Sequence, residues 1–187
     1  MRGVEYYQIP TTFLAMVDSS IGGKTGINLD AAKNLVGAIW QPKAVLIDPN
    51  YLISLPKREV VSALGEVLKY GAILDRPFFN YLSDNLDELL AMGNPHLSET
   101  VIRKCAELKA KIVEQDECEG DLRRILNFGH TVGHALEKYF GYGVLRHGEA
   151  VSYGMLAAGK LSVEFGGLTS EDYGLLSQMI ERLPLPL

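Results

Sequence analysis

The chain has 187 residues, of which 47% are hydrophobic and 22% are charged. This balance is typical of a globular domain with its own core and excludes an intrinsically disordered chain. A formal net charge of −5 argues against general affinity for nucleic acid. Two cysteines without CxxC spacing support neither a disulfide framework nor a thiolate zinc site.

The first 50 residues predict a small β-rich segment. Three short apolar runs are predicted as strands: residues 4–9, 13–17 and 44–47. Pro10 separates the first two runs, and the Asp48-Pro49 pair ends the third. Between them, Gly22, Gly23 and Gly26 predict a glycine-rich turn.

From Ser54 onward the apolar residues recur with helical spacing, which predicts a bundle of six helices. The first has Ser54 as its N-cap and Pro56 in its first turn, and the last has Ser170 as its N-cap. The helices between them cover residues 77–92, a stretch beginning at 95, 129–140 and 147–165. We therefore predict a mainly α fold, with a helical domain at 51–187 preceded by the β-rich segment at 1–50.

The segment NFGHTVGH at residues 127–134 carries the strongest chemical signal. His130 and His134 share one helix face, so they can converge on one metal, or one can bind metal while the other transfers protons. Thr131 stands where the metalloprotease pattern HExxH needs glutamate. A bare pair with this spacing is as often two ordinary histidines, but Gly129 and Gly133 leave room for a ligand.

Two further residues complete a candidate metal site. A turn and the next helix bring His147 back beside His130. His96, at a predicted helix start, is interpreted as a solvated residue. Catalytic zinc often takes two histidines and one carboxylate, and Glu66 is a carboxylate inside an apolar helical stretch. The alternative for Glu66 is an ordinary surface ion pair with Lys69.

The segment DSSIGGKTG at residues 18–26 predicts an anion-binding turn. It is not a nucleotide phosphate loop, because Asp18 occupies the position of the first glycine. Lys24 adds a positive charge, and further cations and polar residues follow at Lys33, Asn34, Lys109, Arg123 and Arg124. Each alone reads as a solvated side chain, but together they favour a pocket for a phosphorylated, hydroxyl-rich substrate.

These segments together resemble the 3-dehydroquinate synthase family. The matching strings, in this order, are IPTTFLAMVDSSIGGKTGIN, KNLVGAIWQP, ALGEVLKYG, LRRILNFGHTVGHALE and LRHGEAVSYGM. The resemblance covers most of this chain but only part of the family's protein. It implies conversion of 3-deoxy-D-arabino-heptulosonate 7-phosphate to 3-dehydroquinate and phosphate in the shikimate pathway, by transient oxidation with NAD, phosphate elimination, reduction and aldol closure.

The resemblance also assigns site residues. The metal ligands, for Zn²⁺ or Co²⁺, are Glu66, His130 and His147. The catalytic residues are His134, Glu119, Lys24, Lys109 and Arg123. The substrate contacts are Asp18, Lys24, Asn34, Lys69, Lys109, Arg123, Asn127 and His134. The NAD contacts are Thr11, Thr12, Lys33, Tyr51, Leu52, Ile53 and Ser54.

The chain departs from the family at both ends. We expect an N-terminal NAD-binding domain to be absent, the C-terminal end to be shortened, and the activity of this chain alone to be weak. The resemblance implies a homodimer. No apolar run approaches the about 20 residues of a membrane span, and the first ten residues do not show the signal-peptide pattern of a charged start and a long apolar middle. We therefore expect a cytoplasmic protein that has neither a membrane nor a nucleic acid as partner.

Three alternatives stay open. One is a related cyclase that makes aminocyclitol precursors, and another is a metal-dependent polyol dehydrogenase of the same architecture. Two features favour the dehydroquinate enzyme over both: the segment GGKTG at residues 22–26, and Glu66. The third alternative is a non-catalytic, metal-binding helical domain.

Overall fold

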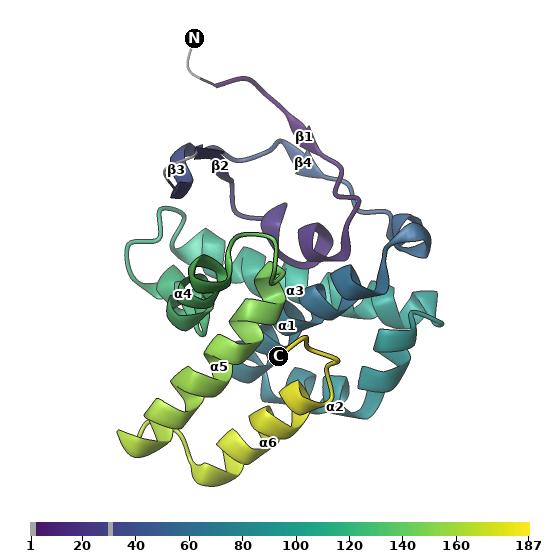
Figure 1. Cartoon of the computed structure of the whole chain (residues 1–187). Coiled ribbons are helices and arrows are strands. Elements are labelled where there is room, and N and C mark those ends of the chain that lie inside the picture. Colours follow the sequence, from purple (N-terminus) through teal and green to yellow (C-terminus); the bar gives the residue numbers. More distant parts are fainter. Residues whose placement is uncertain (1–2, 30–31) are drawn as a thin grey trace.

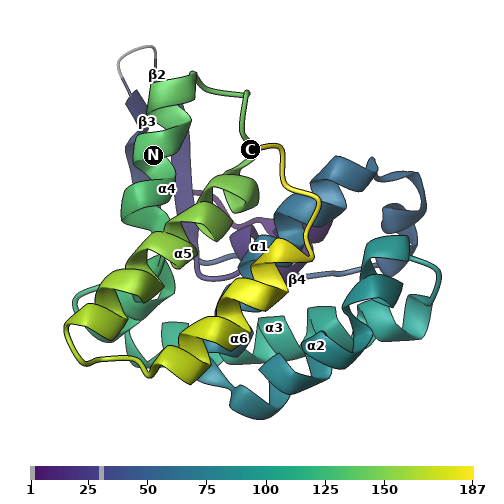
Figure 2. The same ribbon diagram turned by 60° about the horizontal axis from the view of Figure 1, so that its bottom comes forward.

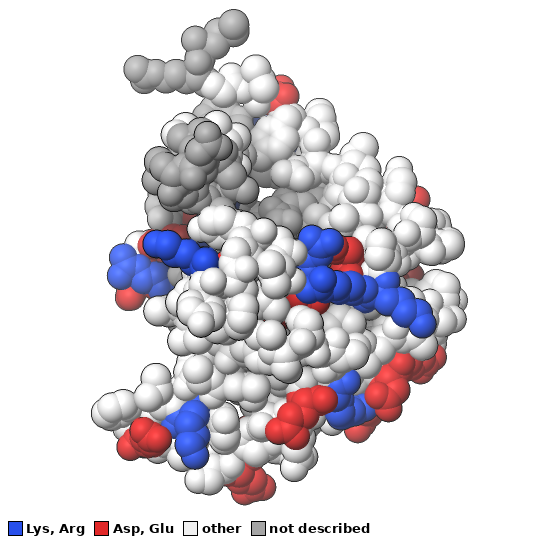
Figure 3. Space-filling view, in the orientation of Figure 1, with Lys and Arg blue, Asp and Glu red and all other residues white. Residues whose placement is uncertain are grey.

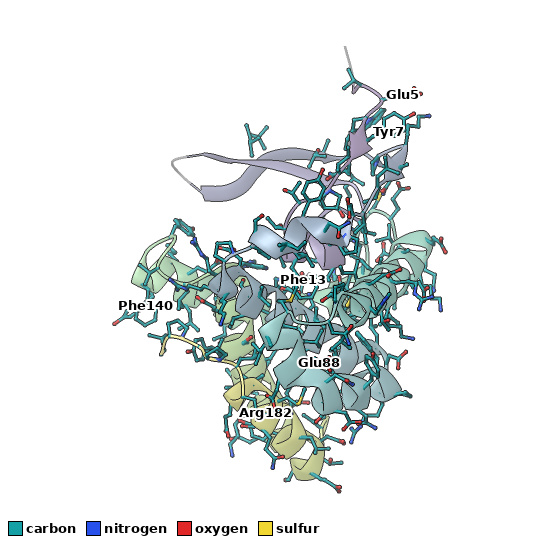
Figure 4. All side chains as sticks on the ribbon, turned by 90° about the vertical axis from the view of Figure 1, so that its right-hand side faces the viewer. Glu5, Tyr7, Phe13, Glu88, Phe140 and Arg182 are labelled. Atoms are coloured by element: carbon teal, nitrogen blue, oxygen red, sulfur yellow. The ribbon has the colours of Figure 1, made fainter. Side chains whose placement is uncertain are left out.

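The computed structural model describes the backbone of residues 3–29 and 32–187. Side chains are described for the same residues except those in 28–35. The strands gather at one end of the molecule and the helices fill the rest (Figure 1). Seen from the side, Phe13 lies where the two parts meet, whereas Glu5 and Tyr7 lie at the far end (Figure 4). The predicted mainly α fold class is confirmed, and the division into domains at residue 50 stays a prediction.

Two small sheets make up the β-rich segment. β1 (Tyr7–Gln8) pairs in parallel with β4 (Ala44–Val45), which confirms shortened versions of two predicted strands. β2 (Lys24–Leu29) and β3 (Ala32–Ile39) form an antiparallel hairpin that the sequence analysis missed. The predicted turn glycine Gly26 lies within this hairpin, opposite Gly37. The turn itself contains only Gly22 and Gly23, both with positive φ.

The predicted strand at residues 13–17 is wrong. This stretch leads into a turn of π-helix, η1 (Ala15–Ser19), that packs on the helical body. Phe13, Met16 and Val17 are all fully buried there. Their spacing of three and four residues is helical, so only a helical backbone places all three on one face. Pairing of this apolar run with another strand would have divided it between two faces.

The six predicted helices are all present. They are α1 (Lys57–Leu74), α2 (Arg76–Ala91), α3 (Pro95–Gln115), α4 (His130–Phe140), α5 (His147–Glu164) and α6 (Ser170–Glu181). Two short 3₁₀ helices, η2 (Pro49–Ser54) and η3 (Leu122–Asn127), precede α1 and α4. Two predicted caps are wrong. Ser54 ends η2 and Pro56 is the N-cap of α1, while the Thr169 side chain caps α6 by accepting from the Asp172 N–H at 3.0 Å.

α1 is the central helix of the molecule. Figure 2 shows α2, α3, α5 and α6 arranged around it, and all four contact it. Every residue from Val60 to Gly71 is buried, so this helix has no solvent-facing side there. Such a helix should be apolar all round, yet it contains Glu66 and Lys69. These two charged residues inside the core mark the site described below.

The surface carries mixed charge. On the face shown in Figure 3, Lys and Arg side chains lie among Asp and Glu side chains rather than forming one continuous basic area. None of the helices in the described parts of the chain combines the length and apolarity needed to cross a bilayer.

Candidate active site

Three side chains from different helices converge at the centre of the molecule. Glu66 lies in the middle of α1, and His130 and His147 are the first residues of α4 and α5. The Nε2 atoms of His130 and His147 lie 3.5 and 3.3 Å from Glu66 Oε1. One donor atom from each of the three lies within 4.8 Å of the others. This convergence is the one that the sequence predicted for a single cation.

The chemistry of these donors fits a divalent metal ion. Glu66 is fully buried, and neither of its carboxylate oxygens has a hydrogen-bond partner among the described residues. Oε2 forms an ion pair with the buried ammonium of Lys69, so the exposed surface pair considered above is ruled out. A buried carboxylate without hydrogen bonds is costly. Two imidazoles and a carboxylate are the ligand set of many catalytic zinc sites, and binding of an ion would remove that cost.

The protonation states of Glu66 and His130 at pH 7 suit metal binding, whereas that of His147 does not. Burial raises the pKa of Glu66, but the charge of Lys69 and contact with His147 outweigh it and lower the pKa to about 2. Burial lowers the pKa of His130 to about 4, so this imidazole is neutral at pH 7. Burial also opposes a charged His147, but Glu137 and Glu66 raise its pKa to about 9. A metal ion must therefore displace a proton from His147.

The close crossing of α1 and α5 sets the distance between Glu66 and His147. A Cβ atom at Gly148 would overlap the backbone oxygen of Ser62, one turn before Glu66 on α1. The Gly148 N–H donates to Ser62 Oγ at 3.0 Å, and Ser152 Oγ donates to the Gly148 carbonyl at 2.7 Å. Gly148 therefore lets the two backbones touch, which brings the adjacent His147 over Glu66.

A second contact holds the first turn of α5. Buried Glu149 accepts hydrogen bonds from Arg58 Nε and from the Arg146 N–H, both at 2.7 Å. Arg58 belongs to α1 and also donates to the Val144 carbonyl at 2.6 Å. This ion pair ties the loop before His147 to α1, so the ligand-bearing end of α5 is fixed at two points.

An open cavity of about 710 Å³ lies against two of the three converging residues, His130 and His147. Its lining includes His130, His147 and the following predicted substrate or catalytic residues: Asp18, Lys24, Lys69, Lys109, Glu119, Arg123, Asn127 and His134. The imidazole of His134 lies 5.5 Å from that of His130 and 5.9 Å from that of His147, centre to centre. The predicted substrate residues whose side chains are described thus share one pocket.

Asp18 organises one wall of this cavity. Its Oδ1 accepts hydrogen bonds from Tyr70 OH and Lys109 Nζ, both at 2.6 Å, and its carbonyl accepts from Lys109 Nζ at 2.7 Å. Burial opposes ionisation of Asp18, but Lys109 and Lys69 hold its pKa well below the usual value. Burial also lowers the pKa of Lys109. The ammonium group of Lys109 is therefore held in place before any substrate binds.

Another part of the cavity lining is a loop fixed by Asp116. Its carboxylate accepts from the N–H groups of Gly120, Asp121 and Arg123 at 2.8–2.9 Å, and these bonds lower its pKa to about 2. The almost fully buried Arg123 side chain donates to the carbonyls of Gly22 and Glu117 at 2.8 and 2.7 Å. It therefore joins this loop to the glycine turn.

Glu119 projects from the same loop. Its carboxylate pairs with Lys24 and accepts from Asn127 Nδ2 at 2.9 Å. Burial raises the pKa of Glu119, but these two partners lower it below the usual value. Its backbone has a positive φ of 59°, an uncommon conformation for a residue other than glycine.

The predicted NAD contacts lie elsewhere. The stretches that follow the parallel strands β1 and β4 leave the same sheet edge, and they contain Thr11 and Thr12 on one side and Tyr51 to Ser54 on the other. None of these residues lines the cavity. Leu52 is buried in the core, whereas Ile53 is 88% exposed. The side chains of Lys33 and Asn34 lie outside the described residues.

Several site residues escaped the sequence analysis. Glu137 is 3% exposed and its Oε1 lies 3.8 Å from His147 Nδ1. Its position seven residues after His130 puts it on the same helix face, a signal that could have identified it. Tyr70 and Arg58 have no comparable signal, because they meet Asp18 and Glu149 only across contacts between different elements.

Comparisons with known proteins agree on one family. Residues 1–62 match the model of the 3-dehydroquinate synthase N-terminal region and residues 63–187 that of the C-terminal region. The chain is 51% identical over 186 residues to 3-dehydroquinate synthase of Citrifermentans bemidjiense and 50% identical over 187 residues to that of Geobacter sp. strain M21. In both comparisons all of this chain is covered, and it spans about half (51%) of the relative's length.

Two solved structures share the fold. One is ValA, a 2-epi-5-epi-valiolone synthase from Streptomyces hygroscopicus with bound NAD⁺ and Zn²⁺, with a TM-score of 0.90 and 32% identity over 99% of this chain and 51% of that one. The other is 2-deoxy-scyllo-inosose synthase with carbaglucose-6-phosphate, NAD⁺ and Co²⁺, with a TM-score of 0.89 and 31% identity over 100% of this chain and 52% of that one.

Proposed function

Because the chain belongs to the 3-dehydroquinate synthase family, we propose that it forms the metal- and substrate-binding part of that enzyme. The reaction is the conversion of 3-deoxy-D-arabino-heptulosonate 7-phosphate to 3-dehydroquinate and phosphate. The observation that carries the proposal is the convergence of Glu66, His130 and His147 at the edge of a cavity lined by positively charged side chains. We place this activity in the cytoplasm, supported by two free cysteines.

Glu66, His130 and His147 hold the metal in this proposal. A bound Zn²⁺ or Co²⁺ supplies a Lewis acid and a template for vicinal hydroxyls. The buried carboxylate of Glu66 supplies negative charge, and the neutral imidazole of His130 is ready to ligate. Both structural relatives are bound to a divalent metal ion, Zn²⁺ in one and Co²⁺ in the other, which supports this assignment.

The cations of the cavity bind the anionic groups of the substrate. Lys24, Lys109 and Arg123 line the cavity together with Lys69, and a phosphate and a carboxylate are the groups that such a set attracts. Lys109 and Arg123 are already held by Asp18 and by backbone carbonyls. Little further ordering of these two side chains is needed, which favours binding.

His134 and Glu119 handle protons in the proposal. His134 lies on the cavity wall beside the metal-binding histidines, where an imidazole can take or return a proton near pH 7. Lys24 and Asn127 lower the pKa of Glu119, so its carboxylate is ionised at pH 7 and can accept a proton. Asp18 serves to position Lys109.

The assignment of NAD rests on the two stretches at the sheet edge, Thr11–Thr12 and Tyr51–Ser54, and on Lys33. Within residues 3–29 and 32–187, no strand leads through a glycine-rich turn into a helix, which is the usual pyrophosphate site. The described residues therefore fit only part of the dinucleotide. We expect this chain alone to bind NAD weakly and to turn over slowly.

The metal site is tested on the chain itself. Titration with Co²⁺, followed by visible absorption, should show one equivalent bound by the wild-type chain. His130→Ala should abolish this binding, whereas His96→Ala, which removes an exposed histidine far from the site, should not. Equal binding by wild type and His130→Ala would remove the metal site from the proposal.

The reaction is tested after adding the part of a relative that this chain does not span. The chain is joined to the uncovered half of the C. bemidjiense relative, and phosphate release is measured with Zn²⁺ and NAD present. Release from the heptulosonate substrate and none from glucose 6-phosphate is expected. The reverse preference would assign the chain to the related cyclases instead.

A further inference from the structure

Glu137 has no role in the proposed reaction, although it is a buried charged residue next to a metal ligand. It lies on α4 with 3% exposure, and its Oε1 is 3.8 Å from His147 Nδ1. On the other side of the same ring, His147 Nε2 faces Glu66 at 3.3 Å. The imidazole of His147 therefore lies between two buried carboxylates on different helices.

We propose that Glu137 is a positioning residue that holds His147 with Nδ1 protonated and Nε2 directed at the metal ion. This inference rests on the metal site of the proposed function. A neutral imidazole carries one ring proton, so only one of its nitrogens can bind metal. With Nε2 facing Glu66 and His130, the proton belongs on Nδ1, and a carboxylate there accepts it and fixes the ring orientation.

The present distance of 3.8 Å is an ion-pair contact and not a hydrogen bond. The ring of a histidine turns easily about its last torsion, because that torsion has broad minima. Rotation about this torsion changes the distance between His147 Nδ1 and Glu137 Oε1, so the proposal predicts a shorter contact once the metal ion is bound.

An alternative interpretation is that Glu137 and His147 belong to a second metal-binding site. His134, Glu137 and His147 also offer donor atoms within 4.8 Å of one another. Occupation of both sites would require His147 to ligate through both nitrogens, which demands removal of its last ring proton. One ion with Glu137 as hydrogen-bond acceptor needs no such deprotonation. The two readings differ in metal stoichiometry, which the experiment measures.

The test compares Co²⁺ binding by the 187-residue chain and its variants in competition with a chelator. Glu137→Gln keeps the shape of the side chain and removes its charge. We expect its affinity to fall about 10- to 100-fold, as is typical for loss of a residue that orients a metal ligand. The Co²⁺ absorption bands should also shift, while circular dichroism and the unfolding midpoint without metal stay close to wild type. Glu137→Asp should bind more tightly than Glu137→Gln.

The matched control is Glu114→Gln, which removes the same charge from an exposed position on α3. Its Co²⁺ affinity and absorption should equal those of the wild type. Wild-type Co²⁺ affinity in a folded Glu137→Gln chain would overturn the inference. The inference would also be overturned if the wild type bound two equivalents of Co²⁺ and Glu137→Gln lost only the second. Absence of Co²⁺ binding by the wild type would instead contradict the metal site of the proposed function.

A measurement on the wild type needs no variant. In the Zn²⁺-loaded chain, histidine ¹⁵N–¹H NMR should show His147 protonated at Nδ1 and metal-bound at Nε2, with the Nδ1 proton shifted downfield by a hydrogen bond. Protonation at Nε2 would overturn the inference even if Glu137→Gln failed to fold.

Discussion

Burial distinguishes between two interpretations of Glu66 and Lys69, a surface ion pair and a functional pair. Their separation of three residues on α1 predicts a surface ion pair as readily as a functional one. Both are buried, at 0% and 2% exposure. A buried charge pair without further hydrogen bonds does not favour stability, so its presence in the core agrees with a role in binding.

Asp116 supplies a prediction about pH. Its pKa of about 2 lies below the ordinary value of 3.8, because three backbone N–H groups donate to the carboxylate. The folded state therefore binds fewer protons than the unfolded state, and the stabilisation is present above about pH 4 and is lost as the pH falls toward 2. The urea midpoint of the wild type should exceed that of Asp116→Asn at pH 7, and the difference should shrink between pH 4 and 2.

NMR gives an independent check on the same residue. The amide protons of Gly120, Asp121 and Arg123 should titrate together with a midpoint near pH 2. A common midpoint at the ordinary aspartate value would show that the carboxylate does not hold the loop.

At the scale of elements, the metal site depends on how closely α1 and α5 approach. Gly148→Ala should force these helices apart, because the new methyl group overlaps the Ser62 carbonyl. We expect the free energy of unfolding to fall by about 1–3 kcal/mol and Co²⁺ affinity to fall at least about tenfold. Urea denaturation and chelator competition measure the two effects.

The matched control for this helix contact is Gly174→Ala on α6. No atom of another element lies within 4 Å of the position that its methyl group would take, so stability should be unchanged or higher by up to about 1 kcal/mol. Co²⁺ affinity should stay at the wild-type value. If Gly148→Ala behaved like this control, the close approach of the helices would not be what positions His147.

At the scale of the whole molecule, a bound metal ion should stabilise the fold, because its proposed ligands come from three helices. Zn²⁺ at 100 times its dissociation constant should add about 2.7 kcal/mol to the free energy of unfolding, a rise in Tm of roughly 5–10 °C. Differential scanning calorimetry with and without a chelator measures it. His130→Ala should lose the rise and His96→Ala should keep it. An unchanged wild-type Tm at saturating Zn²⁺ would contradict a site shared by α1, α4 and α5.

The sequence by itself determined the helices and most of the candidate site. Apolar residues at helical spacing predict α1 to α6, because that spacing repeats over many turns. The strings around Glu66, His130 and His147 identified the family, and they predict these three residues as the metal ligands. Short elements were harder to predict from the sequence, because a run such as residues 13–17 is apolar enough for either a strand or a helical turn.

Only the tertiary structure decided which residues support the site from other elements. Glu137 reaches His147 from α4, Arg58 reaches Glu149 from α1, and Tyr70 reaches Asp18 from α1. Arg58 and Tyr70 are distant in the sequence from their partners, so no local pattern connects those pairs. The same holds for Gly148, whose need for glycine arises from the backbone of another helix. Local periodicity determines which segments become helices, whereas the packing between helices determines which side chains meet.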